Sequence, residues 1–178
     1  MRNGLFYTTY AGDPYYNMAF DEWLLKRAFC WPGVCFLRVY SWWPGAITFG
    51  LNQREQSALD FSKVGETAVI RRITGGRALF HDCGELTYSV VINEDNEQGN
   101  LAGKAPWEAS ELIAKALVQF LHQGGVEASY AAASVPRRAP SSFFHKAPCF
   151  ASTARHEVIG RGGKVVASAQ RRVGDTFL

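Results

Sequence analysis

The stretch ETAVIRRITGGRALFHDCGELTYSVVIN, residues 66–93, carries most of the strand signal in this chain of 178 residues. Its first part is a β-branched run that ends in the pair Gly75–Gly76, which is typical of a strand running into a turn. Its second part predicts two paired strands connected through residues 82–84. We therefore expect a sheet to form the centre of the fold.

The sequence on either side predicts helices and further strands. A helix is expected over residues 13–28, because Asp13 can cap it and Pro14 suits its first turn. A second, amphipathic helix is expected over residues 106–123, ended by two glycines. Further strands are expected over residues 34–42, 46–53, 126–133, 157–160 and 164–172, with a surface loop over 134–148. This order of elements indicates an α/β or α+β domain.

The composition is typical of one globular domain. Hydrophobic residues make up 47% and charged residues 20% of the chain, and the length suits a single domain. A net charge of +3 is too small to indicate nucleic-acid binding. No apolar window approaches the roughly 18 residues of a membrane span and the N-terminus lacks a signal peptide, so we expect a cytoplasmic protein. The four cysteines show no metal-binding spacing, so we expect no metal site.

Residues 71–81, RRITGGRALFH, are a first candidate for ligand binding. Glycines let backbone N–H groups come close to a ligand, and Arg71 and Arg72 offer charge for a carboxylate or phosphate. A glycine pair between strands is also a common plain turn, and His81 alone fits a hydrogen-bonded structural histidine. The segment matches neither the phosphate loop nor the dinucleotide fingerprint.

A second candidate is residues 148–172, PCFASTARHEVIGRGGKVVASAQRR. The thiolate is the nucleophilic form of cysteine, and a nearby cation lowers the pKa of a thiol. Lys164 is a candidate cation for Cys149, because EVIGRGGKVV predicts a hairpin. The simpler interpretations are a buried structural thiol and an exposed lysine after a glycine turn, and the residues alone leave both open.

Four blocks in this order resemble the lipoate-protein ligase and octanoyltransferase family, which is related to biotin protein ligases. The blocks are NMAFDEWLL (17–25), RVYSWWPGAITFGLNQ (38–53), RRITGGRALFHDCGELTYSVV (71–91) and GGKVVASAQRR (162–172). The second is similar to the family's first sheet hairpin, and the fourth to the segment that bears the family lysine, here Lys164. The resemblance implies an α/β (α+β) catalytic domain with a mixed, mostly antiparallel sheet flanked by helices.

Within the family, Cys149–Phe150 and the TGGR of residues 74–77 are similar to the cysteine-dependent protein N-octanoyltransferase branch. The resemblance implies that Cys149 forms an acyl thioester and that Lys164 favours the thiolate and holds the acyl carbonyl. Leu79 and Val165 are expected to line an apolar acyl tunnel. The implied substrate-binding residues are Arg71, Arg72, Thr74, Gly75, Gly76, Arg77, Ala78, His81, Ala167 and Ser168.

The implied reaction moves an octanoyl or lipoyl group from acyl carrier protein to a lysine of a lipoyl carrier domain, such as glycine cleavage H protein, without a cofactor or metal. Two alternatives remain: a lipoate-protein ligase that uses ATP and Mg, and a non-catalytic module that binds acyl groups or carrier domains. The resemblance covers nearly the whole chain, but the family domain normally continues beyond GDTFL, residues 174–178. We therefore expect a single catalytic domain over 1–178 that is truncated at its C-terminus.

Overall fold

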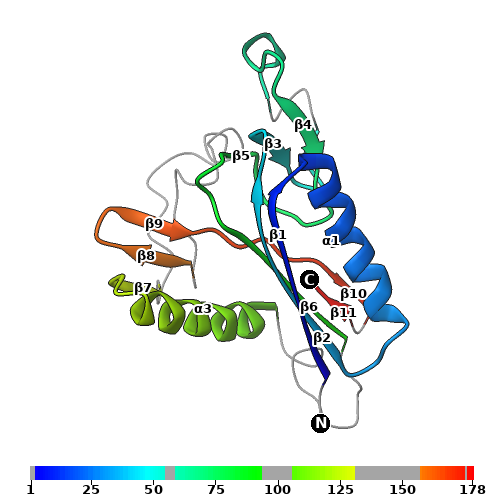
Figure 1. Ribbon diagram of the computed structural model, residues 1–178, viewed down its shortest axis with the longest axis vertical. Helices are drawn as coiled ribbons and strands as arrows, with labels where there is room; N and C mark the ends of the chain where they lie inside the picture. Colours follow the sequence, from blue (N-terminus) through cyan, green and yellow to red (C-terminus); the bar gives the residue numbers. More distant parts are fainter. Residues whose placement is uncertain (1–2, 55–58, 94–105, 131–156, 175) are drawn as a thin grey trace. The chain divides into compact units, whose positions relative to one another are not determined.

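The computed structural model describes residues 3–54, 59–93, 106–130, 157–174 and 176–178 (Figure 1). The chain divides into two compact units, one of residues 1–103 with 170–178 and the other of residues 104–169. The strand pairs are mostly antiparallel, with two parallel pairs among them. The predicted fold class, a mixed and mostly antiparallel sheet structure with helices, is confirmed. No helix among the described residues is long and apolar enough to cross a membrane.

The first unit contains a five-stranded sheet with the order β1-β2-β6-β11-β10. Its strands are β1 (Asn3–Gly12), β2 (Val34–Trp42), β6 (Thr87–Asn93), β10 (Arg172–Val173) and β11 (Thr176–Phe177). Strands β1 and β2 are parallel, and the other neighbours are antiparallel. The predicted strand over residues 34–42 is confirmed, whereas β1 and β11 were not predicted from the sequence.

A second sheet of the same unit has β3 (Ala46–Phe49) between β4 (Ala68–Arg71) and β5 (Leu79–His81), and a short 3-10 helix, η1 (Phe61–Lys63), precedes β4. Two predicted pairings are wrong: β2 and β3 do not form a hairpin, and β5 does not pair with β6. The reason is that a strand has only two edges. Strand β2 lies between β1 and β6, and β3 lies between β4 and β5, so the chain changes sheet at both connections.

The second unit contains α3 (Pro106–Gln123), β7 (Ala128–Tyr130), β8 (Val158–Gly160) and β9 (Gly163–Val166). The predicted helix is confirmed; it ends at Gln123, two residues before Gly125, which has a positive φ of 78°. The predicted hairpin is also confirmed, because β8 and β9 pair in antiparallel register. The strand expected over 164–172 stops at Val166, and the loop expected over 134–148 lies outside the described residues.

Helix α1 (Pro14–Phe29) begins as predicted and packs on one face of the five-stranded sheet (Figure 1). Asp13 caps it by accepting hydrogen bonds from the backbone N–H groups of Tyr15 and Tyr16, both at 3.0 Å. Its buried apolar residues form one cluster with side chains of β2 and β6. The cluster comprises Leu24, Leu25, Ala28, Val34, Phe36, Val91 and Leu178. Burial of each larger side chain stabilises the fold by about 1.5–3 kcal/mol.

An ion pair also joins α1 to β2. Arg38 lies on the buried face of β2 with a fully buried side chain, and its Nη1 donates to Asp21 Oδ1 at 2.8 Å. The guanidinium also donates to the backbone oxygen of Asn17 at 2.9 Å and to its Oδ1 at 2.6 Å. Asn17 and Asp21 are four residues apart, so they share one face of the helix. The ion pair therefore fixes which face of α1 meets the sheet.

Burial shifts the acid–base properties of this cluster. Burial raises the pKa of the Asp21 carboxyl above its usual value, although the charge of Arg38 acts in the opposite direction. Tyr40 donates its hydroxyl hydrogen to Asp21 Oδ2 at 2.8 Å. Burial, reinforced by the negative charge of Asp21, raises the pKa of Tyr40 well above 10.0. The folded chain therefore holds the Tyr40 proton more tightly than the unfolded chain does.

We expect Asp21→Asn to lower the free energy of unfolding by about 3–5 kcal/mol, because it leaves a buried guanidinium without its counter-charge. Guanidinium chloride denaturation measures the change. Glu22→Gln is the matched control, because it removes a charge from the adjacent residue, whose ion pair with Lys26 is solvent-exposed and worth less than about 0.5 kcal/mol. Equal losses in the two variants would contradict a structural role for the buried pair.

The raised pKa of Tyr40 predicts a loss of stability in alkali. The contribution of the Tyr40 hydroxyl to the free energy of unfolding is fully present below pH 10. It is lost as the pH rises toward the higher pKa of the folded state, because in this range only the unfolded chain releases the proton. Tyr40→Phe removes this pH-dependent contribution to stability and also the hydrogen bond to Asp21. The gap in unfolding free energy between the wild type and Tyr40→Phe should therefore narrow between pH 9 and pH 11. A gap that stays constant across this range would show that Tyr40 titrates alike in both states.

Candidate active site

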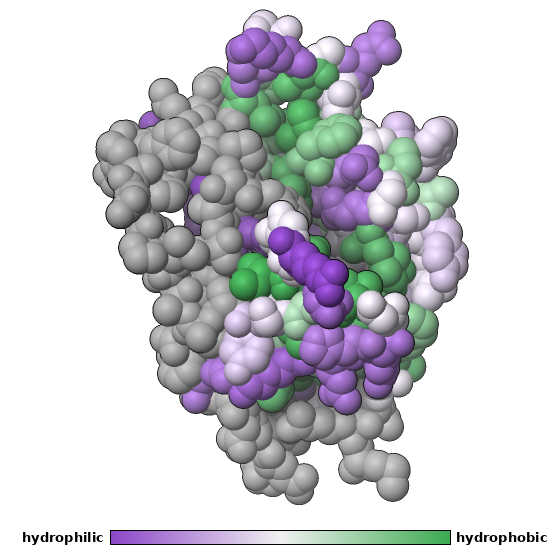
Figure 2. Space-filling model, turned by 90° about the vertical axis from the view of Figure 1, so that its left-hand side faces the viewer, coloured by the Kyte–Doolittle hydropathy of each residue, from purple (hydrophilic) through white to green (hydrophobic). Residues whose placement is uncertain are grey.

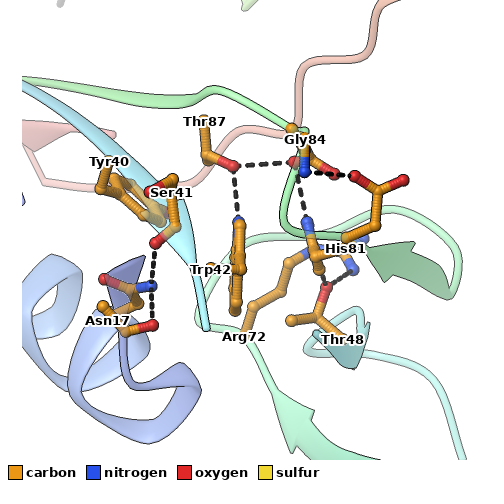
Figure 3. Close-up of polar contacts among 12 residues, drawn as sticks. Asn17, Tyr40, Ser41, Trp42, Thr48, Arg72, His81, Gly84 and Thr87 are labelled. Carbon is orange, nitrogen blue, oxygen red and sulfur yellow. Dashed lines mark hydrogen bonds and ion pairs between the residues drawn. The ribbon is translucent and has the colours of Figure 1, made fainter. Parts of the chain in front are cut away.

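The glycine loop after β4 is held by the side chain of Arg72. The guanidinium donates to the carbonyl oxygen of Gly75 from Nε at 3.1 Å and from Nη2 at 2.7 Å, and to that of Arg77 from Nη2 at 2.8 Å. Its Nη1 donates to Thr48 Oγ1 at 3.1 Å (Figure 3). Arg72 thus fixes the shape of its own loop, and whether it also contacts a substrate stays a prediction.

Close backbone packing constrains the same loop. Gly76 has a φ of 93°, a conformation that favours glycine. A Cβ atom at Gly50 would collide with the carbonyl oxygen of Gly76, so position 50 also requires glycine. The N–H group of Gly75 donates to the backbone oxygen of Gln170 at 3.3 Å. The glycine pair is therefore packed against other backbone rather than forming an open turn.

Arg71 holds the start of the loop through hydrogen bonds to the segment that follows β3. Its Nη1 donates to the backbone oxygens of Leu51 at 2.9 Å and Gln53 at 2.7 Å, and its guanidinium lies over the ring of Phe49 at 4.4 Å. The N–H group of Leu51 donates to the carbonyl oxygen of Thr74 at 2.9 Å. The segment after β3 and the glycine loop are thereby joined into one backbone layer.

His81, the last residue of β5, is buried and hydrogen-bonded at both ring nitrogens (Figure 3). Its Nε2 lies 2.8 Å from Thr48 Oγ1, and its Nδ1 lies 2.8 Å from Glu85 Oε1. Trp42 stacks on the imidazole with ring centroids 4.0 Å apart. Trp42 Nε1 donates to Thr87 Oγ1 at 2.8 Å, and Thr87 donates to Glu85 Oε1 at 2.7 Å. His81 is thus a hydrogen-bonded histidine, as the simpler interpretation expects.

Lys164 lies in the second unit, on β9 opposite Ile159 of β8. Its side chain is 2% exposed, and its Nζ donates to Glu157 Oε1 at 2.9 Å. The simpler expectation of an exposed lysine is therefore wrong. Burial of an ammonium is tolerated here because a carboxylate pairs with it. The hairpin thus holds a fixed, buried cation.

Val165 does not share a face with Lys164, because successive side chains of a strand point to opposite sides. It is 43% exposed, and with Val126 it lines an open cavity of about 360 Å³ that includes none of the predicted site residues. The face of the molecule in Figure 2 mixes hydrophobic residues, in green, with hydrophilic ones, in purple. The expected tunnel lining by Val165 therefore finds no support on the face of β9 that carries Lys164.

The other predicted residues are placed as follows. Ala167 and Ser168 follow β9 and belong to no strand, and Cys149 lies outside the described residues. Among the described residues, no group of three or more histidine, cysteine or acidic side chains could hold a metal ion.

Sequence reasoning missed three residues that shape the loop. Thr48 looked like an ordinary strand residue, because threonine is also a common β-former. Glu85 stands four residues after His81 in the matched block, and Gly50 directly follows β3. The contact of His81 with Glu85 had no local signal, because a spacing of four brings side chains together on a helix and these two residues flank a turn.

Known proteins resemble this chain in sequence and in fold. The family model described as the lipoyl protein ligase A/B catalytic domain matches residues 13–178. An octanoyltransferase LipM of Macrococcus caseolyticus is 33% identical over 174 residues, which cover 94% of this chain and 60% of that protein. The chain therefore spans 60% of the length of this relative.

Two solved structures share the fold. One is an archaeal bipartite lipoate protein ligase, studied with its E2 lipoyl domain, from Thermoplasma acidophilum; it has a TM-score of 0.70 and 20% identity, covering 99% of this chain and 59% of that one. The other is a lipoate-protein ligase A bound with ATP, with a TM-score of 0.68 and 21% identity, covering 98% of this chain and 62% of that one.

The family prediction made from the four sequence blocks is confirmed by the match over residues 13–178. The chain belongs to the lipoyl protein ligase A/B catalytic domain family.

Proposed function

We propose that this chain is the catalytic part of an octanoyltransferase of protein lipoylation, which acts through a thioester on Cys149. The family membership and the similarity to an octanoyltransferase support the proposal. The observation that carries it is the buried ammonium of Lys164, paired with Glu157. Glu157 makes the burial of this cation possible, and a fixed ammonium is a group that can stabilise a thiolate and a developing oxyanion.

The reaction proceeds in two balanced steps. The Cys149 thiolate attacks the carbonyl carbon of octanoyl-acyl carrier protein, a new C–S bond forms, and the phosphopantetheine sulfur leaves as a thiolate. The neutral amine of a lipoyl-domain lysine then attacks the same carbon, a C–N bond forms, Cys149 leaves as a thiolate, and the proton that the amine loses goes to water. No cofactor or metal enters either step.

Lys164 has two roles in this scheme. Its positive charge favours the thiolate form of Cys149, and its N–H groups donate to the acyl oxygen as negative charge develops there. Glu157 positions the ammonium at 2.9 Å. The proposed substrate-binding residues remain Arg71, Thr74, Gly75, Gly76, Arg77, Ala78, Ala167 and Ser168. Arg72 and His81, which were also expected to bind substrate, are instead proposed to support the loop, because their polar atoms bond to groups of the chain itself.

The ATP-dependent ligase is the second candidate, because one structure that shares the fold was solved with ATP bound. In that reaction, Arg71 and Arg72 would face an adenylate phosphate, with Mg alongside. The 33% identity to an octanoyltransferase favours the transferase. Carrier partners of the chosen reaction are octanoyl-acyl carrier protein and a lipoyl domain such as glycine cleavage H protein.

We expect octanoyl-acyl carrier protein to add a hydroxylamine-sensitive octanoyl mass to the wild-type chain, without ATP. Intact mass spectrometry measures the product. Cys149→Ala should abolish the adduct, because no other group is proposed to attack the thioester. Cys83→Ala is the matched control, because Cys83 is an exposed thiol of the described chain, and it should retain the adduct. An adduct of undiminished yield on Cys149→Ala would refute the covalent route, and pyrophosphate release that requires lipoate and ATP would select the ligase.

Lys164→Met should slow acylation of the chain about 10²- to 10³-fold, the usual effect of losing one oxyanion donor. Rapid-quench measurement of the single-turnover rate detects the change. Arg161→Gln serves as the control, because Arg161 belongs to the same hairpin but its side chain is 83% exposed. If both variants acylate at the wild-type rate, Lys164 has no part in the chemistry.

A further inference from the structure

We propose that Thr48 and His81 are positioning residues. Their hydrogen bonds hold the guanidinium of Arg72, which in turn orients the backbone N–H groups of the glycine loop. We call this set of contacts the relay: His81 Nε2 contacts Thr48 Oγ1, which accepts from Arg72 Nη1. The same guanidinium donates to the carbonyl oxygens of Gly75 and Arg77. The link to acyl transfer rests on the proposed function, whereas the effect on loop structure does not.

The hydrogen bonds in this relay have one consistent direction. Thr48 has a single hydroxyl hydrogen, and its oxygen already accepts from Arg72. The hydroxyl can accept from Arg72 and donate to His81 Nε2 at the same time, and we assign it as that donor, which places an imidazole hydrogen on Nδ1. That N–H group donates to Glu85 Oε1. Only a group that accepts at the Nε2 position satisfies the Thr48 hydroxyl.

The far end of the relay prevents the imidazole from turning. Glu85 Oε1 accepts from His81 and also from Thr87, whose oxygen accepts from Trp42 Nε1. The indole of Trp42 stacks on the imidazole at 4.0 Å. Trp42, Thr48 and His81 are at most 5% exposed. A buried network in which every described contact has a donor and an acceptor is rigid, and breaking it leaves unsatisfied polar groups.

The functional consequence follows from the planarity of the peptide group. In a trans peptide the C=O and the following N–H point in opposite directions. Because the carbonyl oxygens of Gly75 and Arg77 point toward Arg72, the N–H groups of Gly76 and Ala78 point away from it. The direction of each of these two backbone donors is thereby set by a contact with Arg72. They suit the carbonyl oxygen of an acyl thioester, which is uncharged in the substrate and gains negative charge during attack.

Thr48→Val is the direct test, because it keeps the shape of threonine and removes the hydroxyl. The measurements are hydrogen–deuterium exchange of the peptide that spans residues 72–78 and single-turnover acylation at increasing octanoyl-acyl carrier protein. We expect about tenfold faster loop exchange and an about tenfold lower maximal acylation rate, the size of effect expected from one lost hydrogen bond to a charged group. Thr48→Ser retains the hydroxyl and should restore both values to within about twofold of the wild type.

A matched pair at position 81 tests the direction of the relay. In His81→Gln, the amide oxygen reaches the Nε2 position and accepts from Thr48, whereas in His81→Asn the shorter amide reaches only the Nδ1 position, beside Glu85. We expect the glutamine variant to keep slow loop exchange and the asparagine variant to lose it. This pair carries the test if Thr48→Val fails to fold, as judged by circular dichroism.

Unchanged loop exchange in Thr48→Val, or equal exchange in the two His81 variants, would overturn the relay. Failure of the proposed function looks different: the wild-type chain would form no acyl adduct, while loop exchange would still respond to Thr48→Val. A general loss of stability is separated from the relay by exchange in α1 (Pro14–Phe29), which should match the wild type in every variant.

Discussion

The buried ion pair between Arg38 and Asp21 is the constraint on which the first unit depends. A guanidinium with 0% exposure needs a counter-charge and hydrogen-bond acceptors, and here Nη1 and Nη2 have them although Nε has none among the described residues. Asn17 and Asp21 supply these partners from one face of α1, and the ring of Tyr40 lies 3.9 Å below the guanidinium. Apolar packing alone tolerates sliding of a helix over a sheet. The ion pair does not, so it sets both the rotation and the position of α1 on β2.

The same face of β2 continues from this ion pair to the glycine loop. Arg38, Tyr40 and Trp42 alternate along the strand and are all buried. Trp42 then stacks on His81, which connects through Thr48 to the guanidinium that shapes the loop. One strand therefore anchors the helix at its centre and supports the candidate active site at its end. A disturbance at Arg38 should reach the loop through the placement of β2.

Local signals in the sequence were enough for the helices, for β2 and for the β8–β9 hairpin. Asp13 and Pro14 mark a helix start, and Gly125 marks a helix end, whatever the rest of the chain does. The partition into separate sheets was not predictable, because it depends on which distant strand occupies each edge. Strand β1 was missed although its residues 5–10, LFYTTY, are aromatic and β-branched. Its pairing with β2 is parallel, so no short turn between the two strands marks it in the sequence.

The residues of the candidate site also fall into two groups: those that a local sequence pattern predicts and those that only the fold brings together. Lys164 and the glycine pair were found because they form recognisable local patterns. The contacts of Thr48 with His81 and Arg72 join residues 33 and 24 positions apart, and a threonine in a strand gives no sign that its hydroxyl is used. The burial of Lys164 could not be predicted from a local pattern either, because it depends on the ion pair with Glu157 across the hairpin.

The proposed covalent route is tested most directly by isolating the octanoyl adduct of the wild-type chain and mixing it with a lipoyl domain in the absence of ATP and acyl carrier protein. We expect the octanoyl group to leave the chain and appear as an amide on the lipoyl-domain lysine in a single turnover, at the rate of the complete reaction. An adduct that persists while the complete reaction turns over would contradict the route, because the thioester would then be a side product rather than an intermediate.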